Sequence, residues 1–530
     1  MEKGKWEFFK GNKENWFSEP LYNWMNLSEI PEAPGLKERC TTDRIRQALS
    51  PWSDLFLIKL EFFPEGSYRE EGTPRLSNIQ GFYMATIRHR ISGSHTAQMK
   101  ILLPVRWNGR FMGIAGAGSN LSTPWDMEQT VNLTTWPMAI RNGFACALND
   151  GGTGPFVDAG WGFGKDGDLE WDLMENWAYT GTHHMTEMAK AVVEAVYGKP
   201  IYKSYMHGTS GGGRQAVVEA VHYPRDYDGL WADGPLYDYY NLMFSLLWAP
   251  VVIHNEAHHV SLEKYKAVNV LARMEDFTAT EPYSLQSPRW QRFLASLPGT
   301  KTKDGPITEE DLQVMIRMWN GPVLTDGSPI TYGFGPEIVQ WPVGPRKFGY
   351  LKTHDDGSLS IVPFALQFIR WLTRDPDYDI NRCSYEAFSR IYLDHREEFA
   401  DYSFYDADLA AFGARGGKLI ITHGTGDHVV PNQITRDFYK KALNYFPSEK
   451  ALADTLRIFM PERTGHALFD WSGPNVKNSS AWPALMAWVE KGQAPEYLQT
   501  LEYNFVDDCV IRQDQVSCYQ GESGGSGHTS

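Results

Sequence analysis

The stretch that decides the fold is Tyr205-Met206-His207-Gly208-Thr209-Ser210-Gly211-Gly212-Gly213-Arg214-Gln215. A short apolar run, 201–206, leads into it, and the apolar spacing of 216–221 predicts a helix packed on a sheet. Ser210 therefore stands at a turn from a buried strand into a helix. The glycines at 208 and 212 permit a sharp turn, and a helix N-terminus favours negative charge near the serine. Such a nucleophile elbow predicts a reactive hydroxyl at Ser210.

A second stretch with the same serine and glycine spacing, Gly521-Glu522-Ser523-Gly524-Gly525, lacks this context. We expect neither a strand before it nor a helix after it. Its Gly/Ser-rich composition is typical of a flexible end. Context therefore selects Ser210 as the candidate nucleophile.

Size and composition limit the class of protein. Single hydrophobic cores stop growing near roughly 250–300 residues, so 530 residues predict a main domain with a large insertion. A net charge of -15 opposes binding to phosphate backbones, which argues against a nucleic-acid partner. No run reaches the roughly 18 apolar residues that a membrane span needs. The apolar run 246–253 contains a proline and is expected in a core or a pocket wall.

The N-terminal sequence and the cysteines favour a cytoplasmic protein. Residues 1–6 lack the charged-then-apolar plan of a secretion signal, although a trimmed signal stays open. Five cysteines in so long a chain do not form a disulfide scaffold, and reduced thiols are favoured. They are Cys40, Cys146, Cys383, Cys509 and Cys518. A bridge between Cys509 and Cys518 stays open as the alternative.

The chain divides into segments of different character. Strand-like and helix-like runs alternate from about residue 80 to 240, which predicts an α/β sheet covered by helices. Aromatics, prolines and helical pieces without strand rhythm fill 241–400, and we expect a lid domain there. Strand rhythm returns at 417–422 and 456–460, and a helix over 481–491 closes the core. The expected fold is an α/β-hydrolase core formed by residues 1–240 and 401–515, with the lid inserted between them. We expect a flexible tail over 516–530. The first 80 or so residues show no clear pattern.

Two loops supply partners for the serine. In α/β-hydrolases an Asp or Glu and then a His follow the nucleophile, each on a loop after a strand. The strand over 418–422 runs into His423-Gly424-Thr425-Gly426-Asp427, and the strand over 456–460 runs into Pro461-Glu462-Arg463-Thr464-Gly465-His466. We expect His466 to take the proton of Ser210 and Asp427 to orient the imidazole. A turn aspartate and a loop histidine are the alternative interpretations.

An oxyanion hole and a substrate pocket are less sharply indicated. The N–H of Gly211 is one candidate oxyanion donor, and Gly118, in the glycine-rich loop 113–118, is the other. The aromatic side chains of the expected lid are candidates for substrate binding or for the core of the lid. They are Trp248, Trp319, Phe334 and Trp341.

Metal chemistry is not indicated. His254 and His258 are four residues apart, as on one face of a helix, but the glutamate does not follow the first histidine as the zinc-protease pattern requires. Zinc stays open as a minor alternative, and we expect no metal and no cofactor.

Several separate motifs resemble the tannase and feruloyl esterase family, from about residue 80 to 515. They are Trp107-Asn108-Gly109-Arg110-Phe111, Tyr197-Gly198-Lys199-Pro200, the elbow itself, Tyr223-Pro224-Arg225-Asp226-Tyr227-Asp228-Gly229, Asp408-Leu409-Ala410-Ala411-Phe412, Gly416-Gly417-Lys418-Leu419 and Trp488-Val489-Glu490-Lys491-Gly492. The resemblance implies an α/β-hydrolase core, a large lid and hydrolysis of esters, commonly of aromatic acids. It also assigns Ser210, Asp427 and His466 to a catalytic triad.

The chain departs from the family pattern at two places. The family usually has a disulfide between a cysteine before the serine and one after the histidine, and these positions are Thr209 and Ala467 here. Losing both together suits a reducing compartment. Many relatives have an aspartate-rich calcium loop, but residues 271–278 lack the repeated oxygen ligands. We therefore expect no calcium.

The sequence favours a serine carboxylic ester hydrolase that works through an acyl-enzyme on an ester of an aromatic or bulky acid. An acyltransferase or a lactone-forming or lactone-opening enzyme with the same triad is the alternative. A non-catalytic binding protein on the same fold is a third possibility, which the complete set of triad residues disfavours. The expected partner is a small-molecule ester, with neither nucleic acid nor membrane.

Overall fold

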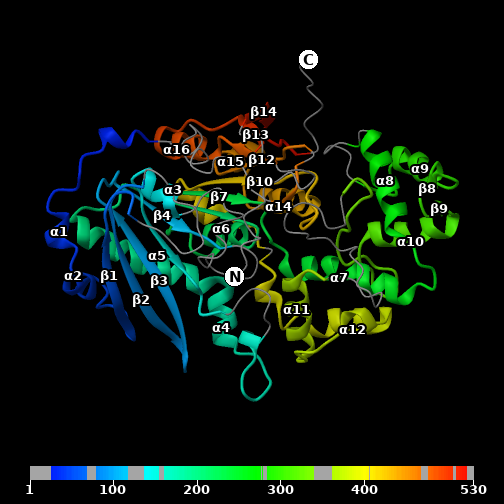
Figure 1. Ribbon diagram of the computed structural model, residues 1–530, viewed down its shortest axis with the longest axis horizontal. Coiled ribbons are helices and arrows are strands. Elements are labelled where there is room, and N and C mark those ends of the chain that lie inside the picture. Colours follow the sequence, from blue (N-terminus) through cyan, green and yellow to red (C-terminus); the bar gives the residue numbers. More distant parts are fainter. Residues whose placement is uncertain are drawn as a thin grey trace.

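A nine-stranded mixed sheet forms the centre of the molecule (Figure 1). The computed structural model describes residues 25–67, 79–116, 136–153, 160–275, 277, 283–338, 361–404, 406–462, 464–466, 475–504 and 509–521. In spatial order the strands are β1 (Leu55–Phe63), β2 (Phe82–Ser92), β3 (His95–Pro104), β5 (Ala145–Asn149), β4 (Arg110–Ile114), β6 (Lys203–Thr209), β7 (Gly229–Asp233), β10 (Lys418–Thr422) and β11 (Leu456–Phe459). This sheet confirms the predicted α/β-hydrolase class of the core.

Six neighbouring strands of the nine are parallel, and this part of the sheet positions the site. Strands β5, β4, β6, β7, β10 and β11 run parallel, whereas β1, β2 and β3 pair antiparallel with their neighbours. The register places Thr209, Asp233, Thr422 and Phe459 side by side across four strands. The loops that follow these strands therefore leave from one edge, the carboxyl edge, of the sheet.

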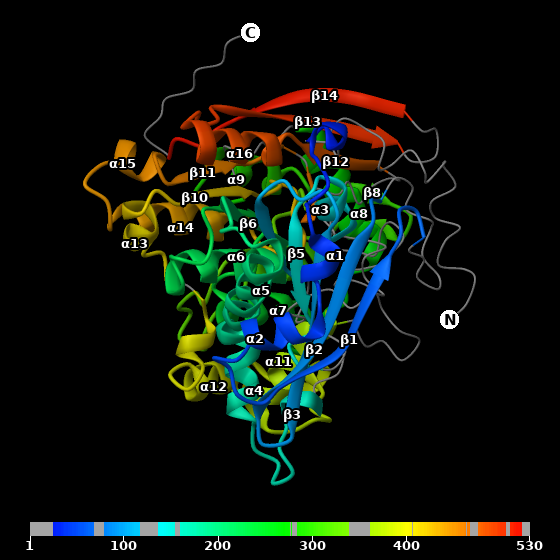
Figure 2. The same cartoon turned by 90° about the vertical axis from the view of Figure 1, so that its left-hand side faces the viewer.

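Helices cover both faces of the sheet. Helices α5 (Gly181–Tyr197) and α6 (Gly211–His222) pack on one face, and α3 (Trp136–Arg141) and α16 (Ala481–Lys491) on the other. In Figure 2, α16 lies above the sheet and α5 and α6 lie below it. Because side chains alternate along a strand, Leu230 and Ala232 join the cluster of α5 and α6, while Trp231 packs with α16.

A helical insertion separates β7 from β10 in the sequence and lies on the right of Figure 1. Its helices are α7 (Tyr239–Asn255), α8 (Leu262–Met274), α9 (Pro288–Ala295), α10 (Glu309–Asn320), α11 (Pro363–Thr373) and α12 (Tyr385–His395). A small hairpin, β8 (Lys301–Thr302) and β9 (Gly305–Pro306), is the only strand pair in the described part of the insertion. Helix α7 contains the apolar run 246–253 and packs on α10, α11 and α12. No helix in the described ranges is long and apolar enough to cross a membrane.

Further elements complete the core. The remaining α-helices are α1 (Leu36–Arg39), α2 (Thr42–Ala48), α4 (Trp171–Glu175), α13 (Ala410–Ala414), α14 (Gln433–Leu443) and α15 (Glu449–Ala453), and a π-helical segment, Asn176–Thr180, precedes α5. An antiparallel sheet of β12 (Asn475–Ser479), β13 (Tyr497–Asn504) and β14 (Cys509–Ser517) lies beside α16 at the top of Figure 1. No clear sequence pattern indicated α1, α2 or β1. Strand β1 lies at the edge of the sheet and exposes Phe56 and Phe62.

The C-terminal strand corrects two expectations. Strand β14 reaches Ser517, so a strand does precede the second serine motif, and residues 516 and 517, expected in a flexible tail, belong to this strand. A bridge between Cys509 and Cys518 is excluded, because nine strand steps separate their Cα atoms by about 30 Å, whereas a disulfide needs less than about 7 Å. Cys518 has a free thiol.

An ion pair between distant segments ties the parallel sheet to α16. The guanidinium of Arg110 donates to both carboxylate oxygens of Glu490, at 2.7 and 2.6 Å, and Tyr205 Oη donates to the same carboxylate at 2.6 Å. Two of the motifs that carried the family resemblance, 107–111 and 488–492, therefore contact each other in the fold.

We expect Glu490→Ala to destabilise the protein by about 2–3 kcal/mol, since it leaves the largely buried guanidinium of Arg110 without its partner. The free energy of unfolding in urea measures this. The matched control is Arg46→Ala, which breaks an exposed pair with Asp43 and is expected to change stability very little. Equal effects of the two substitutions would contradict the prediction.

Candidate active site

Ser210 lies at the turn between β6 and α6 in a strained backbone conformation. Its φ of 61° and ψ of -118° lie outside the regions that non-glycine residues ordinarily occupy. Hydrogen bonds hold this turn, because Ser210 N–H donates to Asp233 O at 2.7 Å and Ser210 O accepts from Leu236 N–H at 3.2 Å. The residue is 6% exposed. The backbone therefore fixes the serine at the carboxyl edge of the sheet.

Glycines make the turn possible for a steric reason. A Cβ on Gly208 would lie 2.1 Å from Gly212 O, and a Cβ on Gly212 would lie 2.1 Å from Gly116 O. Backbone oxygens cannot move away as the end of a side chain can. The early loop after β4 is therefore packed directly against the elbow, and Gly116 N–H donates to Gln215 Oε1 at 3.3 Å.

We expect Gly212→Ala to lower stability by about 3 kcal/mol and to remove most activity, because the added methyl group would displace Gly116 O. Thermal unfolding and ester turnover measure the two effects. Gly213→Ala in the same helical turn is the matched comparison, since its Cβ would lie 2.9 Å from Asp233 O and the displacement needed is smaller. A Gly212→Ala protein as stable as Gly213→Ala would disprove the steric argument.

The predicted acid and base form a hydrogen-bonded pair. His466 Nδ1 lies 2.7 Å from Asp427 Oδ2, although 39 residues separate them. Asp427 is 1% exposed, and its Oδ1 accepts from the N–H groups of Val429 and Val430 at 2.8 and 2.9 Å. Burial alone would raise the pKa of Asp427, but the charges and hydrogen bonds of His466 and His423 outweigh it and hold the pKa well below its usual range. The pair therefore comprises an ionised carboxylate and an oriented imidazole.

The segment after β7 joins this pair to the serine. Asp233 and Leu236 hydrogen-bond the backbone of Ser210, and a Cβ on Gly234, between them, would lie 3.3 Å from His466 Nδ1 and 3.5 Å from Asp427 Oδ2. Gly234 has φ 49°, a conformation that glycine adopts readily. The structure thus brings the three residues to the same edge of the sheet.

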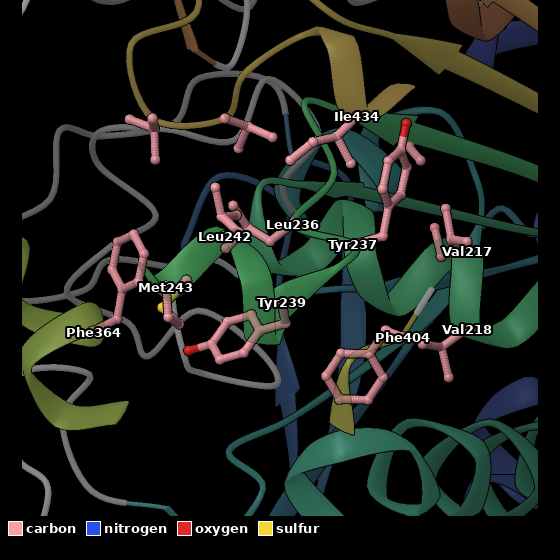
Figure 3. Packing of buried hydrophobic residues seen from close by; sticks show 14 of the residues in the cluster. Val217, Val218, Leu236, Tyr237, Tyr239, Leu242, Met243, Phe364, Phe404 and Ile434 are labelled. Atoms are coloured by element: carbon pink, nitrogen blue, oxygen red, sulfur yellow. The ribbon is translucent and has the colours of Figure 1, made fainter. Parts of the chain in front are cut away.

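Apolar side chains from the insertion pack beside this edge. Leu236 belongs to a buried cluster that also contains Met243 of α7 and Phe364 of α11, and Figure 3 shows these side chains with Val217 and Val218 of α6. The insertion and the elbow helix therefore contribute to one continuous apolar cluster.

The other predicted site residues lie in different places. Gly211 is the first residue of α6, whereas Gly118 and Trp341 lie outside the described residues. The three remaining aromatic candidates, Trp248, Trp319 and Phe334, are buried within the insertion at 2, 2 and 7% exposure. The indole N–H of Trp248 donates to Arg317 O at 2.9 Å, which joins α7 to α10. Thr209 is buried at the end of β6, and Ala467 lies outside the described residues.

The histidines considered for zinc do not share a helix. Helix α7 ends at Asn255, so His258 lies beyond it, and His258 Nε2 contacts Asp311 Oδ1 at 2.8 Å. Within the described ranges, no group of three His, Cys, Asp or Glu side chains is arranged to hold a metal ion.

Sequence reasoning missed two groups beside Asp427. His423 is the residue after β10, and Asp233 is the last residue of β7, where burial raises its pKa to about 7 despite a hydrogen bond from Thr422 Oγ1 at 2.7 Å. His423 was visible in the quoted loop, but its spacing does not show that the folded loop brings its imidazole to Asp427, Val430 and Thr435.

Known proteins resemble this chain in sequence and in fold. The profile of the family described as tannase and feruloyl esterase matches residues 89–520. A probable feruloyl esterase of Arthroderma benhamiae is 28% identical over 415 residues, which cover 74% of this chain and 73% of that protein. Among solved structures, feruloyl esterase B of Aspergillus oryzae superposes with a TM-score of 0.73 at 18% identity, covering 91% of this chain and 96% of the other. The tannin acyl hydrolase of Aspergillus niger superposes with a TM-score of 0.71 at 18% identity, covering 91% of this chain and 92% of the other.

Proposed function

Because this chain belongs to the tannase and feruloyl esterase family, we propose that it hydrolyses esters of aromatic acids through an acyl-enzyme formed on Ser210. The protein is a carboxylic ester hydrolase, and its substrate is a small-molecule ester. The observation that carries the proposed mechanism is the 2.7 Å contact of His466 Nδ1 with Asp427 Oδ2, at the sheet edge where Ser210 occupies its strained turn.

In this mechanism His466 Nε2 takes the proton of Ser210 as Oγ attacks the ester carbonyl carbon. The tetrahedral intermediate collapses, the bond from that carbon to the alcohol oxygen breaks, and His466 gives its proton to the leaving alcohol. Water then attacks the acyl-enzyme with His466 as base, and the acid is released. Asp427 keeps the imidazole in one tautomer and stabilises the imidazolium that forms in each half of the reaction.

The oxyanion of the intermediate needs two N–H donors. Gly211 N–H, at the start of α6, is the first donor in this proposal, where the helix N-terminus adds favourable potential. Gly118 is the proposed second donor. Contacts between Gly116 and the elbow support it, because they bring the early loop to the same turn.

The helical insertion, expected over 241–400, is proposed to act as a lid that encloses the acyl group. The apolar cluster that residues of the insertion share with Val217 and Val218 of α6 supports this role. The burial of Trp248 and Trp319 favours a place in the core of the lid over direct contact with substrate. Acyl transfer or lactone chemistry with the same triad has no observation in its favour.

The proposal is tested with methyl and para-nitrophenyl esters of hydroxycinnamic, benzoic and gallic acids. We expect turnover of at least one aromatic ester, and we expect a fluorophosphonate to label Ser210, as located by peptide mass spectrometry. Turnover without labelling of Ser210 would contradict the mechanism. Labelling of Ser210 with no hydrolysis of any ester would favour acyl transfer.

A further inference from the structure

A second histidine lies behind the proposed acid. His423 Nε2 is 3.2 Å from Asp427 Oδ2, the oxygen that also contacts His466 Nδ1 at 2.7 Å. His423 directly follows β10 and is completely buried. Contacts with two imidazoles therefore restrict the orientation of the Asp427 carboxylate.

The contacts of His423 determine where its proton lies. Nε2 also lies 3.1 Å from Val430 O, and both this carbonyl and the ionised Asp427 can only accept, so Nε2 carries the hydrogen. In a neutral imidazole Nδ1 then accepts, and it lies 2.6 Å from Thr435 Oγ1. Tyr237 Oη donates to the same threonine oxygen.

These contacts form one directed chain. Tyr237 donates to Thr435, Thr435 donates to His423, and His423 donates to Asp427. Tyr237 follows β7, Thr435 belongs to α14, and Val430 lies in the loop after β10, so three segments hold the imidazole in one tautomer. With the N–H groups of Val429 and Val430 on Oδ1, the carboxylate of Asp427 has four donors and no freedom to rotate.

We propose that His423 is a positioning residue that holds the Asp427 carboxylate in the plane required for proton transfer through His466. This inference rests on the proposed function, since it assigns a role within the same reaction. It predicts that loss of the His423 N–H slows the chemical step and leaves substrate binding intact.

The first experiment compares His423→Leu with His423→Gln, using the aromatic ester that the wild type turns over. Leucine supplies no donor, whereas the glutamine amide can place an N–H close to the position of Nε2. Rates are divided by the concentration of sites titrated with diisopropyl fluorophosphate, so that misfolded protein does not count. We expect kcat per site to fall about 10- to 100-fold in His423→Leu with KM within about twofold, and His423→Gln to recover most of the loss.

The matched control is His207→Leu. His207 is also a buried histidine, but it lies inside β6. Neither of its ring nitrogens has a hydrogen-bond partner in the described structure, and it packs against Trp231 and Trp482 on the other face of the sheet. We expect kcat per site within about threefold of wild type. A similar loss in both variants, or a His423→Leu loss that glutamine does not restore, would overturn the inference.

The pH profile adds a readout that a packing defect does not produce. With one donor removed, the carboxylate becomes more basic and the Asp427–His466 pair holds its proton more tightly. The acid limb of kcat/KM is therefore expected to move up by about 0.5 pH unit in His423→Leu. The titratable groups that face Asp427 are His423, His428, His466 and Asp233. The pKa of Asp233 is about 7, so its own titration could contribute to the profile. Repeating the measurement in an Asp233→Asn background removes this contribution.

A second measurement decides the inference independently of esterase activity. The low-field proton NMR signal of His466 Nδ1–H is expected to titrate with the same upward shift in His423→Leu. An unchanged midpoint would overturn the inference even in an active enzyme. Turnover that survives Ser210→Ala would instead defeat the proposed function, and the NMR comparison would still decide the role of His423.

Discussion

Ser210→Ala is expected to lower kcat/KM for aromatic esters by about 10³- to 10⁶-fold, the largest effect of any substitution considered for this protein. The hydroxyl oxygen is the proposed nucleophile, and the substitution removes it. The residual rate would come from binding and from the oxyanion donors. Hydrolysis followed by release of the aromatic acid measures the effect.

The fold should tolerate this change, because alanine occupies the same positive φ with one atom fewer. Thermal unfolding is therefore expected to stay within a few degrees of wild type. The chain provides its own control in Ser523→Ala, at the second occurrence of the same serine and glycine spacing. Wild-type turnover in Ser523→Ala and its loss in Ser210→Ala would support the assignment, whereas the reverse would disprove it.

Asp427→Asn is expected to lower kcat by about 10³- to 10⁴-fold. Asp427 accepts hydrogen bonds on both oxygens, from His466 and His423 on one and from Val429 and Val430 on the other. An amide has a single oxygen, so its NH₂ group must face either the two imidazoles or the N–H groups of Val429 and Val430, which are donors themselves. The imidazole of His466 then loses the acceptor that fixes its tautomer.

This substitution also tests the ionisation of Asp427. Because its pKa is held below the usual range, the ionised carboxylate stabilises the fold above the unfolded pKa of about 4, and this contribution is lost as the pH falls through the folded pKa. We therefore expect Asp427→Asn to be less stable than wild type at pH 7 and the difference to narrow in acid. Asp304→Asn, at an exposed hairpin position, is the control for simple loss of charge and is expected to change neither rate nor stability. An Asp427→Asn enzyme with more than a tenth of wild-type kcat would contradict the assignment.

Local patterns in the sequence predicted much of the core. The strand that ends before Ser210, the helix that follows it and the helix over 481–491 were recognisable because apolar periodicity records which face of an element is buried. The chain order of Ser210, Asp427 and His466 was likewise visible, since each follows a strand-like run. The register of four parallel strands then brings the three loops to one edge.

Other features could not be predicted, because periodicity does not record what a buried face is packed against. The contact between Arg110 and Glu490 spans 380 residues, and that between Tyr237 and Thr435 spans 198. His423 and Asp427 are only four residues apart, but no periodicity in this loop indicates that the imidazole turns toward the carboxylate. The aromatic candidate Trp248 lies in the packing between α7 and α10 for the same reason. The sequence by itself therefore determined the class of fold and the order of the candidate reactive residues, which depend on local spacing, whereas only the tertiary structure decided which distant side chains hold them in place, because that depends on how the elements pack.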